Sequence, residues 1–205
     1  MGTSIQQIRK KLEELLKGKK PVFLFTGDKG SALLVNIVKD MNVRIVFIDT
    51  GYHFKEVIDY AKNYGSEITM ISNNSATARP ENGMVRCCYQ RKAEALKDYL
   101  DNFNAGCLIV PFTDKEKDLG IEDSYLKGIT GTEILRPLAE FSERDIWIEI
   151  RNRNVPFSSI YYKGYSIIDC SCCSTRHGRK NLLKNDKQEN IEDNTMQKLK
   201  ALGYM

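Results

Sequence analysis

The residues best able to do chemistry in this chain are its cysteines, which are spaced unevenly. They form an adjacent pair, a single residue and a group of three within four positions: Cys87, Cys88, Cys107, Cys170, Cys172 and Cys173. Six cysteines in 205 residues are too few for a disulfide scaffold, and a chain of this size does not need one, so we expect reduced thiols. Because five of the six fall in two groups, we predict one site shared by two distant segments.

This predicted site offers four thiolates, from Cys87 and Cys88 and from the turn Cys170 to Cys173, and both zinc and an iron–sulfur cluster are candidates. Two adjacent side chains can hardly reach one small tetrahedral ion without strain. A cluster with separate irons relaxes that demand, and a bound 4Fe-4S centre would carry about −2 of charge. Arg91 and Lys92, one turn further along, would balance it. The alternative is buried apolar cysteine, which we expect for Cys107 within an apolar strand.

Two turns could bind an anionic ligand. The first consists of Thr26, Gly27, Asp28, Lys29, Gly30 and Ser31. It lies where a strand passes into a helix, so backbone N–H groups could face a phosphate or sulfate, although an ordinary strand-to-helix turn also uses glycine. The second turn, Asp49, Thr50 and Gly51, should open onto the same crevice and could hold a nucleotide base or ribose. Alternatively, Asp49 and Thr50 cap the next helix.

The elements that must position these residues follow from hydrophobic periodicity. We predict helices over 3–18, 32–41, 54–64, 86–100 and 142–154, a weak helix over 196–202, and strands over 21–25, 43–48, 68–71 and 107–110. Residues 113–132 are polar and punctuated by glycine, which indicates a loop or hairpin. Strands that alternate with helices predict an α/β fold, a doubly wound, mostly parallel sheet flanked by helices.

Composition limits the function classes. The hydrophobic fraction of 41% and the length of 205 residues indicate one folded domain over 1–205, with an N-terminal helix in 1–20 and a tail in 174–205. No apolar run is long enough to span a membrane, and no apolar signal core follows the start, so we expect a cytoplasmic protein. A formal charge of +4 is too small to indicate a nucleic-acid partner.

Several motifs together resemble one family. They are 26–31, 49–51, Cys-Cys-x-x-Arg-Lys at 87–92, Leu-Arg-Pro-Leu at 135–138, Asp-Ile-Trp at 145–147, Asn-Val-Pro at 154–156, and 165–173. In this order they resemble the cluster-bearing adenylyl-sulfate and phosphoadenylyl-sulfate reductases, the sulfonucleotide reductases. The resemblance implies an adenine nucleotide alpha hydrolase-like fold, with the substrate's phosphate and sulfate over 26–31. It implies a 4Fe-4S cluster on Cys87, Cys88, Cys170 and Cys173, which Lys92 links electrostatically to the substrate sulfate.

Members of this family attack the sulfonucleotide with a cysteine thiolate, and a thioredoxin-like thiol then releases sulfite. Their nucleophile lies in a C-terminal tail, whereas residues 174–205 contain no cysteine. Cys172 is therefore the candidate nucleophile, unless a partner supplies the thiol. The turn at 26–31 partly matches ATP pyrophosphatases, so an ATP-dependent sulfurtransferase acting on tRNA or a small molecule is an alternative. A redox sensor or a zinc-stabilised binding module is a third, and a homo-oligomer is compatible with each.

Overall fold

The computed structural model describes residues 4–64, 68–77 and 87–176. A five-stranded parallel sheet forms its centre, in the order β3-β2-β1-β4-β5. The strands are β1 (Pro21–Phe25), β2 (Arg44–Ile48), β3 (Ile68–Ile71), β4 (Cys107–Ile109) and β5 (Glu133–Leu135). The order places β1 in the middle, with the chain running outward to β3 on one side and to β5 on the other. The predicted doubly wound sheet is confirmed.

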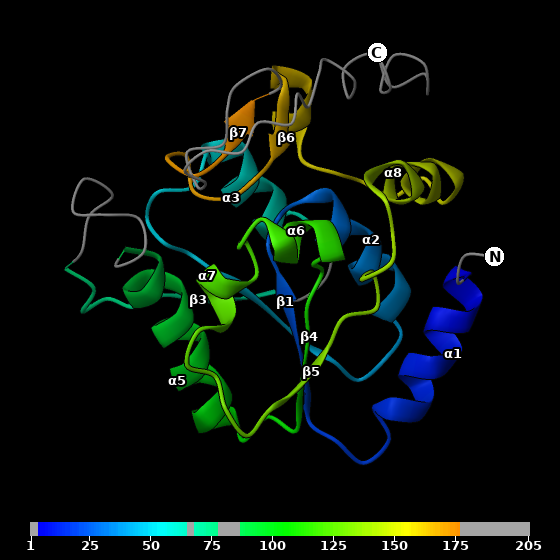
Figure 1. Ribbon diagram of the computed structural model, residues 1–205, viewed down its shortest axis with the longest axis horizontal. Coiled ribbons are helices and arrows are strands. Elements are labelled where there is room, and N and C mark those ends of the chain that lie inside the picture. Colours follow the sequence, from blue (N-terminus) through cyan, green and yellow to red (C-terminus); the bar gives the residue numbers. More distant parts are fainter. Residues whose placement is uncertain (1–3, 65–67, 78–86, 177–205) are drawn as a thin grey trace.

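Helices cover both faces of this sheet (Figure 1). One face carries α1 (Ile5–Leu15), α2 (Lys29–Val38), α3 (Lys55–Lys62) and α8 (Glu143–Asn152). The other carries α5 (Glu94–Phe103) and α7 (Asp123–Leu126). Every residue of β1 is buried, as expected for a central strand with helices on both of its faces.

Capping residues set the boundaries of several helices. The side chain of Ser4 accepts a hydrogen bond from Gln7 N, and Gln7 returns one to the Ser4 backbone. Ser142 and Asp145 form the same reciprocal pair at the start of α8. Such pairs satisfy amide groups that would otherwise lack partners in the first turn. The predicted cap at Ser142 is confirmed, and α8 ends at Asn152, two residues before the predicted end.

The prediction of a loop or hairpin over 113–132 is wrong, because this stretch contains α6 (Asp114–Asp118) and α7. The start of α6 is fixed by Thr113, whose side chain accepts from Glu116 N while Glu116 accepts from Thr113 N. The Thr-x-x-Glu spacing at 113–116 is a sequence signal for a helix start that hydrophobic periodicity does not contain. The strand β5 was also not predicted, and its three residues are too short to show a period.

The segment predicted as one helix over 86–100 is more complex. Cys87 and Cys88 are α-helical, Tyr89–Ala93 form a π-helix (η2), and α5 continues to Phe103. A π-helical turn adds a residue to the repeat and often occurs at functional sites. Arg86 and the helix predicted over 196–202 lie outside the described residues.

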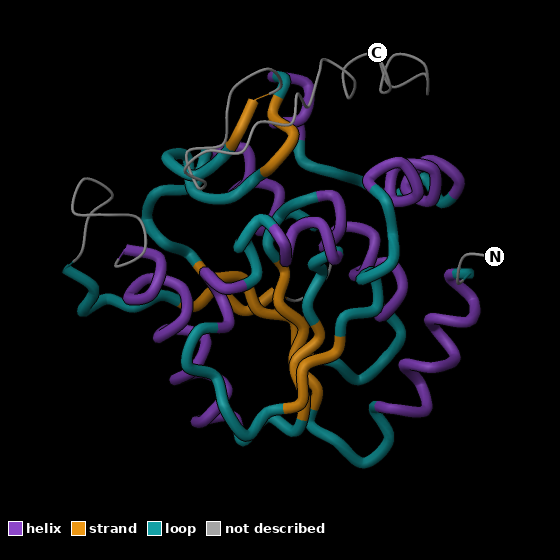
Figure 2. Tube along the Cα trace, in the orientation of Figure 1, coloured by secondary structure: helices purple, strands orange, loops and turns teal. Residues whose placement is uncertain are grey.

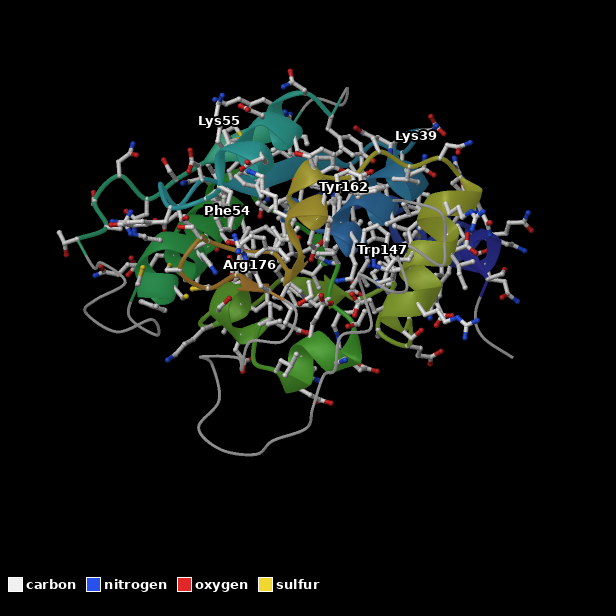
Figure 3. The ribbon with its side chains drawn as sticks, turned by 90° about the horizontal axis from the view of Figure 1, so that it is seen from above. Lys39, Phe54, Lys55, Trp147, Tyr162 and Arg176 are labelled. Atoms are coloured by element: carbon white, nitrogen blue, oxygen red, sulfur yellow. The ribbon has the colours of Figure 1, made fainter. Side chains whose placement is uncertain are left out.

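A small second layer lies beyond the carboxyl ends of the central strands (Figures 1 and 2). It contains the 3₁₀-helix η3 (Ser159–Lys163) and an antiparallel pair, β6 (Tyr165–Ile167) and β7 (Thr175–Arg176). The Tyr165 ring contacts the Phe54 ring at 4.8 Å and the Arg176 guanidinium at 4.7 Å. Figure 3, in which the molecule is seen from above, labels Phe54 and Arg176. These contacts hold the second cysteine segment over the sheet edge.

Candidate functional site

Both cysteine groups line one pocket beside the carboxyl end of the sheet. Its lining consists of Cys87, Cys88, Arg91, Lys92, Cys170, Cys172 and Cys173. No disulfide joins any of the six cysteines of the chain. The structure thus brings together the two segments that the sequence predicted to meet. Cys107 is fully buried in β4, away from this pocket, as expected for a core residue.

The second cysteine group is held in a tight turn that is anchored to the end of β2. Cys173 N donates to the carbonyl oxygen of Cys170 at 2.9 Å, and Ser171 N donates to that of Tyr52 at 2.7 Å. Tyr52 follows the predicted ligand turn 49–51 directly, so this hydrogen bond holds the cysteine turn next to that ligand turn. The turn directs Cys170 and Cys173 toward Cys88, with which they form a buried cluster.

The thiols of this pocket differ in their acidity. Hydrogen bonds from Cys172 and Cys173 lower the pKa of Cys170 strongly. The bond between Cys170 and Cys172 also raises the pKa of the Cys172 thiol. A hydrogen bond from Cys173 also lowers the pKa of Cys88. The hydroxyl of Thr50 lies 3.1 Å from Cys170 Sγ. The pocket therefore favours thiolate at Cys170 and Cys88, the form that binds metals.

Two cations line the same pocket, as predicted, but both already have partners. Arg91 donates to the carbonyl oxygens of Thr50 at 3.1 Å and Ala76 at 3.2 Å, and stacks on the Tyr52 ring at 4.8 Å. The amine of Lys92 lies 2.5 Å from a carboxylate oxygen of Asp169. Burial lowers the pKa of Lys92, but Asp169, Tyr125, Cys170 and Cys88 together outweigh this effect, so the pKa is raised and the amine stays charged.

The donor set suits an iron–sulfur cluster by residue type and position. Cys87, Cys88, Cys170 and Cys173 are all buried, come from two segments and line one pocket that also carries two cations. Thiolates are the usual ligands of such clusters, and nearby positive charge compensates their negative charge. Within the described ranges, no group of three or more His, Cys, Asp or Glu side chains is arranged to hold a metal ion, so the fit rests on the thiol donors and their shared pocket and not on a preformed coordination geometry.

The turn 26–31 lies at the end of β1, where α2 begins. The Asp28 side chain caps α2 by accepting from Ser31 N at 2.7 Å. Gly27 has a φ of +79°, and a Cβ there would lie 2.7 Å from Val57 Cγ1. Glycine is thus required at this position both for its backbone conformation and for close packing.

The amide and the amine of Lys29 both have partners within the chain. Lys29 N donates to the Tyr161 hydroxyl at 2.7 Å, and Nζ donates to the carbonyl oxygen of Ser166 at 3.1 Å. Glu143 Oε1 lies 3.5 Å from Nζ. Burial lowers the pKa of Lys29, whereas Glu143, Glu116 and Asp28 raise it, and the net effect is a rise. Lys29 is therefore a buried cation in an environment rich in carboxylates.

A second pocket opens beside this turn. It is lined by Thr26, Asp28, Lys29, Phe112, Glu116, Ile121, Tyr125, Ile167 and Ile168. Thr26 Oγ1 is buried and has no hydrogen-bond partner in the described part of the chain. Burial, followed by the charge of Asp28, raises the pKa of Glu116. An unpartnered buried hydroxyl is costly, so the pocket has an unused donor for a ligand.

The turn 49–51 does not cap α3. Asp49 Oδ1 accepts from Gly51 N at 2.8 Å, and Thr50 Oγ1 accepts from Tyr52 N at 3.3 Å. The α3 cap is Phe54, which makes no side-chain capping bond. Thr50 instead links the end of β2 to Cys170, so the helix-capping alternative for these two residues is wrong.

Comparison with known proteins shows a family match for most of the chain. Residues 20–176 match the family described as the phosphoadenosine phosphosulfate reductase domain. The chain belongs to this family. The match covers β1 through β7 and includes both cysteine groups. The predicted sulfonucleotide reductase resemblance is thereby confirmed, and the family supports the prediction of an oxidoreductase that acts on sulfur.

Individual relatives of this reductase-family chain are distant. An adenosine 5'-phosphosulfate reductase from Deinococcus radiodurans is 24% identical over 143 residues, which cover 63% of this chain and 56% of that protein. The chain thus matches little more than half of that relative's length. A phosphoadenylyl-sulfate reductase from Candida auris has the same fold, with a TM-score of 0.63 at 13% identity, covering 85% of this chain and 99% of that one.

A further solved structure is the U34-tRNA thiolase NcsA from Methanococcus maripaludis with its [4Fe-4S] cluster. Its TM-score is 0.51 at 11% identity, covering 76% of this chain and 66% of that one. At such identities the likeness concerns the fold alone. No helix within the described residues of the reductase-family chain is long and apolar enough to cross a membrane.

Sequence reasoning missed several polar residues of this reductase-family site. They are Tyr125, Glu116, Glu143, Tyr161 and Asp169. Asp169 carries the clearest missed signal, because it is an acid placed between Ile168 and Cys170. The others come from elements that only the folded chain brings to the carboxyl ends of the strands.

The structure describes one of the two histidines of the chain. His53 bonds to the carbonyl oxygen of Ile48 at 2.9 Å, and His177 lies outside the described residues.

Proposed function

We propose that this protein is a sulfonucleotide reductase that carries a [4Fe-4S] cluster on Cys87, Cys88, Cys170 and Cys173. The observation that carries the proposal is the single pocket in which these thiols meet Arg91 and Lys92. Family membership over residues 20–176 supports the reaction class. When bound, the cluster would supply a compact anionic centre next to the substrate's sulfate.

The proposed nucleotide lies across the carboxyl ends of β1 and β2, the usual crevice of a doubly wound sheet. Its phosphate and sulfate face the turn Thr26–Ser31, where Thr26 Oγ1 offers an unused hydroxyl and Lys29 a buried cation. The turn Asp49–Gly51 faces the adenosine. Thr50 connects this turn to the cysteine pocket through Cys170. The arrangement supports a substrate whose sulfate points toward the thiols.

Cys172 is the proposed nucleophile, because it is the pocket cysteine outside the proposed ligand set and is only partly buried. Its thiolate attacks the substrate sulfur, the bond from sulfur to the phosphate oxygen breaks, and AMP or adenosine 3',5'-bisphosphate leaves with the electron pair. A thioredoxin-like thiol then attacks the Cys172 sulfur and releases sulfite. The two thiols become one disulfide and supply the two electrons. The hydrogen bond to Cys170 and burial raise the pKa of Cys172 and oppose its deprotonation, whereas the hydrogen bond from Cys173 favours it.

A single-turnover assay tests this function. Anaerobically purified protein is mixed with adenylyl sulfate and, separately, phosphoadenylyl sulfate, each with excess dithiol. We expect equal amounts of sulfite and the nucleotide product from one of the two substrates. Failure to form sulfite from either substrate, with iron and sulfide bound, would refute the reductase proposal.

A second candidate is an ATP-dependent sulfurtransferase. The acidic surroundings of the turn 26–31 favour it, because Asp28, Glu116 and Glu143 all lie near Lys29. Carboxylates near a polyphosphate suit a substrate that arrives with magnesium rather than a free sulfonucleotide. Release of pyrophosphate from ATP, without sulfite from either sulfonucleotide, would select this candidate.

A further inference from the structure

Lys92, which lines the cysteine pocket, forms a buried ion pair with Asp169. The side chain of Lys92 is 1% exposed and that of Asp169 is 8% exposed, and their charged atoms are 2.5 Å apart. The other Asp169 oxygen accepts from the Tyr125 hydroxyl at 3.0 Å. The Lys92 amine also lies 4.6 Å from the centre of the Tyr125 ring. Burying two charges is costly unless each is paired and hydrogen-bonded, which is the case here.

The same carboxylate holds the second cysteine turn. Cys170 N donates to Asp169 Oδ1 at 2.8 Å. The Asp169 backbone is fixed in turn by Ser174, whose hydroxyl accepts from Asp169 N at 2.9 Å and donates to the Asp169 carbonyl oxygen at 3.0 Å. Asp169 therefore connects three segments that are distant in sequence: the π-helix with Lys92, the helix α7 with Tyr125, and the turn with Cys170.

We propose that Asp169 is a positioning residue that neutralises Lys92 and thereby sets the electrostatic environment, and with it the reduction potential, of the group bound by the cysteines. This inference rests on the proposed cluster. The family resemblance implies that Lys92 acts on the substrate sulfate as a cation. In this chain the nearest partner of its amine is Asp169, so the net charge of the pair is zero next to the thiols.

The direction of the effect follows from electrostatics. Reduction adds negative charge to an iron–sulfur cluster, and the potential depends on the charges and hydrogen bonds around the sulfurs. Asp169→Asn keeps the size of the side chain and a carbonyl acceptor for Tyr125 and Cys170 N, but leaves the Lys92 charge uncompensated. The extra positive charge stabilises the reduced form. We expect at least a tenfold rise in the ratio of reduced to oxidised cluster at a fixed potential, which is about 59 mV for a one-electron couple.

The test is a redox titration, followed by electron paramagnetic resonance, of reconstituted wild type, Asp169→Asn and the double variant Lys92→Gln/Asp169→Asn. The double variant lacks both charges, and we expect its ratio to lie within threefold of wild type. Lys92→Gln alone leaves the Asp169 charge uncompensated and should lower the ratio, so it tests the charge pair if Asp169→Asn fails to fold. Tyr125→Phe is a matched control, because it removes a neutral hydrogen bond from the same carboxylate.

The outcomes separate this inference from the proposed cofactor. A raised potential in Asp169→Asn, restored in the double variant, supports the inference. If Asp169→Asn binds the cluster at the wild-type potential, or if the double variant shows the same shift as the single variant, the role of Asp169 charge is overturned while the cluster stands. If wild-type protein takes up no iron and sulfide, both proposals are overturned.

Discussion

The amine of Lys29 lies 3.5 Å from the carboxylate of Glu143, so the cation of the proposed anion-binding turn already faces an anion from within the chain. Glu143 is the first residue of α8, which packs on the same face of the sheet as α2. Figure 3 shows α8 with Trp147 labelled, whose ring contacts that of Tyr161 at 5.0 Å. Tyr161 in turn accepts a hydrogen bond from Lys29 N.

Glu143→Gln should therefore increase the affinity of the turn for anions. A substrate phosphate or sulfate must compete with the Glu143 carboxylate for the Lys29 amine, and the variant removes the competing charge. We expect about a fivefold lower dissociation constant for AMP, a gain of about 1 kcal/mol, typical of one partly exposed charge pair. Isothermal titration calorimetry measures it.

Glu149→Gln serves as the matched control for this measurement. Glu149 lies on the same helix, but its carboxylate bonds to Arg153 at 3.0 Å and not to Lys29. Its substitution should leave AMP affinity unchanged. Equal affinities of Glu143→Gln and wild type would mean that Glu143 does not compete for the bound anion.

Gly27 should be intolerant of a side chain, in contrast to Gly51. Both have positive φ, +79° and +74°, but a Cβ on Gly27 would lie 2.7 Å from Val57 Cγ1 whereas one on Gly51 meets nothing within 4 Å. Gly51→Ala should cost about 1 kcal/mol through backbone strain alone. Gly27→Ala adds a packing clash, for about 3 kcal/mol in total. Urea unfolding compares the two, and equal losses would contradict the packing argument.

The cysteine ligand set makes a direct prediction about iron. Wild-type protein purified without oxygen should bind about four irons and four sulfides per chain, as a 4Fe-4S cluster requires. Cys170→Ser should reduce this content severely, because Cys170 is a buried member of the cysteine cluster. Cys107→Ser is the control, since Cys107 lies in β4 and does not line the pocket. Bound zinc without sulfide in the wild type would favour a structural metal instead.

Much of this arrangement could be predicted because it depends on local patterns. The apolar run Pro21–Phe25 and the glycines of the next turn indicate a buried parallel strand and its connection to a helix, as observed. The clustering of cysteines predicted that two segments meet, and they line one pocket. What could not be predicted depends on long-range contacts. The Lys92–Asp169 pair joins residues 77 positions apart, and no periodicity encodes such a contact.

The polar partners of the turn 26–31 were missed for the same reason. Tyr161 and Glu143 reach Lys29 only because α8 and η3 fold back over the sheet edge. The loop predicted over 113–132 shows a different failure, since its capping signal at Thr113 and Glu116 was present in the sequence and was outweighed by polarity and glycine content. Short helices bury few residues, and α6 has none buried, so hydrophobic periodicity cannot reveal them.

Cys172 provides the sharpest test of the proposed chemistry, because binding and reaction can be separated there. It lines the same pocket as the four proposed ligands, and its Sγ lies 3.7 Å from that of Cys173. If Cys172 is the nucleophile, Cys172→Ser should retain wild-type iron and sulfide while sulfite formation falls by at least about a thousandfold, since a serine hydroxyl is scarcely ionised at neutral pH. Mass spectrometry of the wild type after adenylyl sulfate, without added thiol, should show a sulfonate on Cys172. Unchanged sulfite formation in Cys172→Ser would exclude this role, and loss of iron would instead identify Cys172 as a ligand.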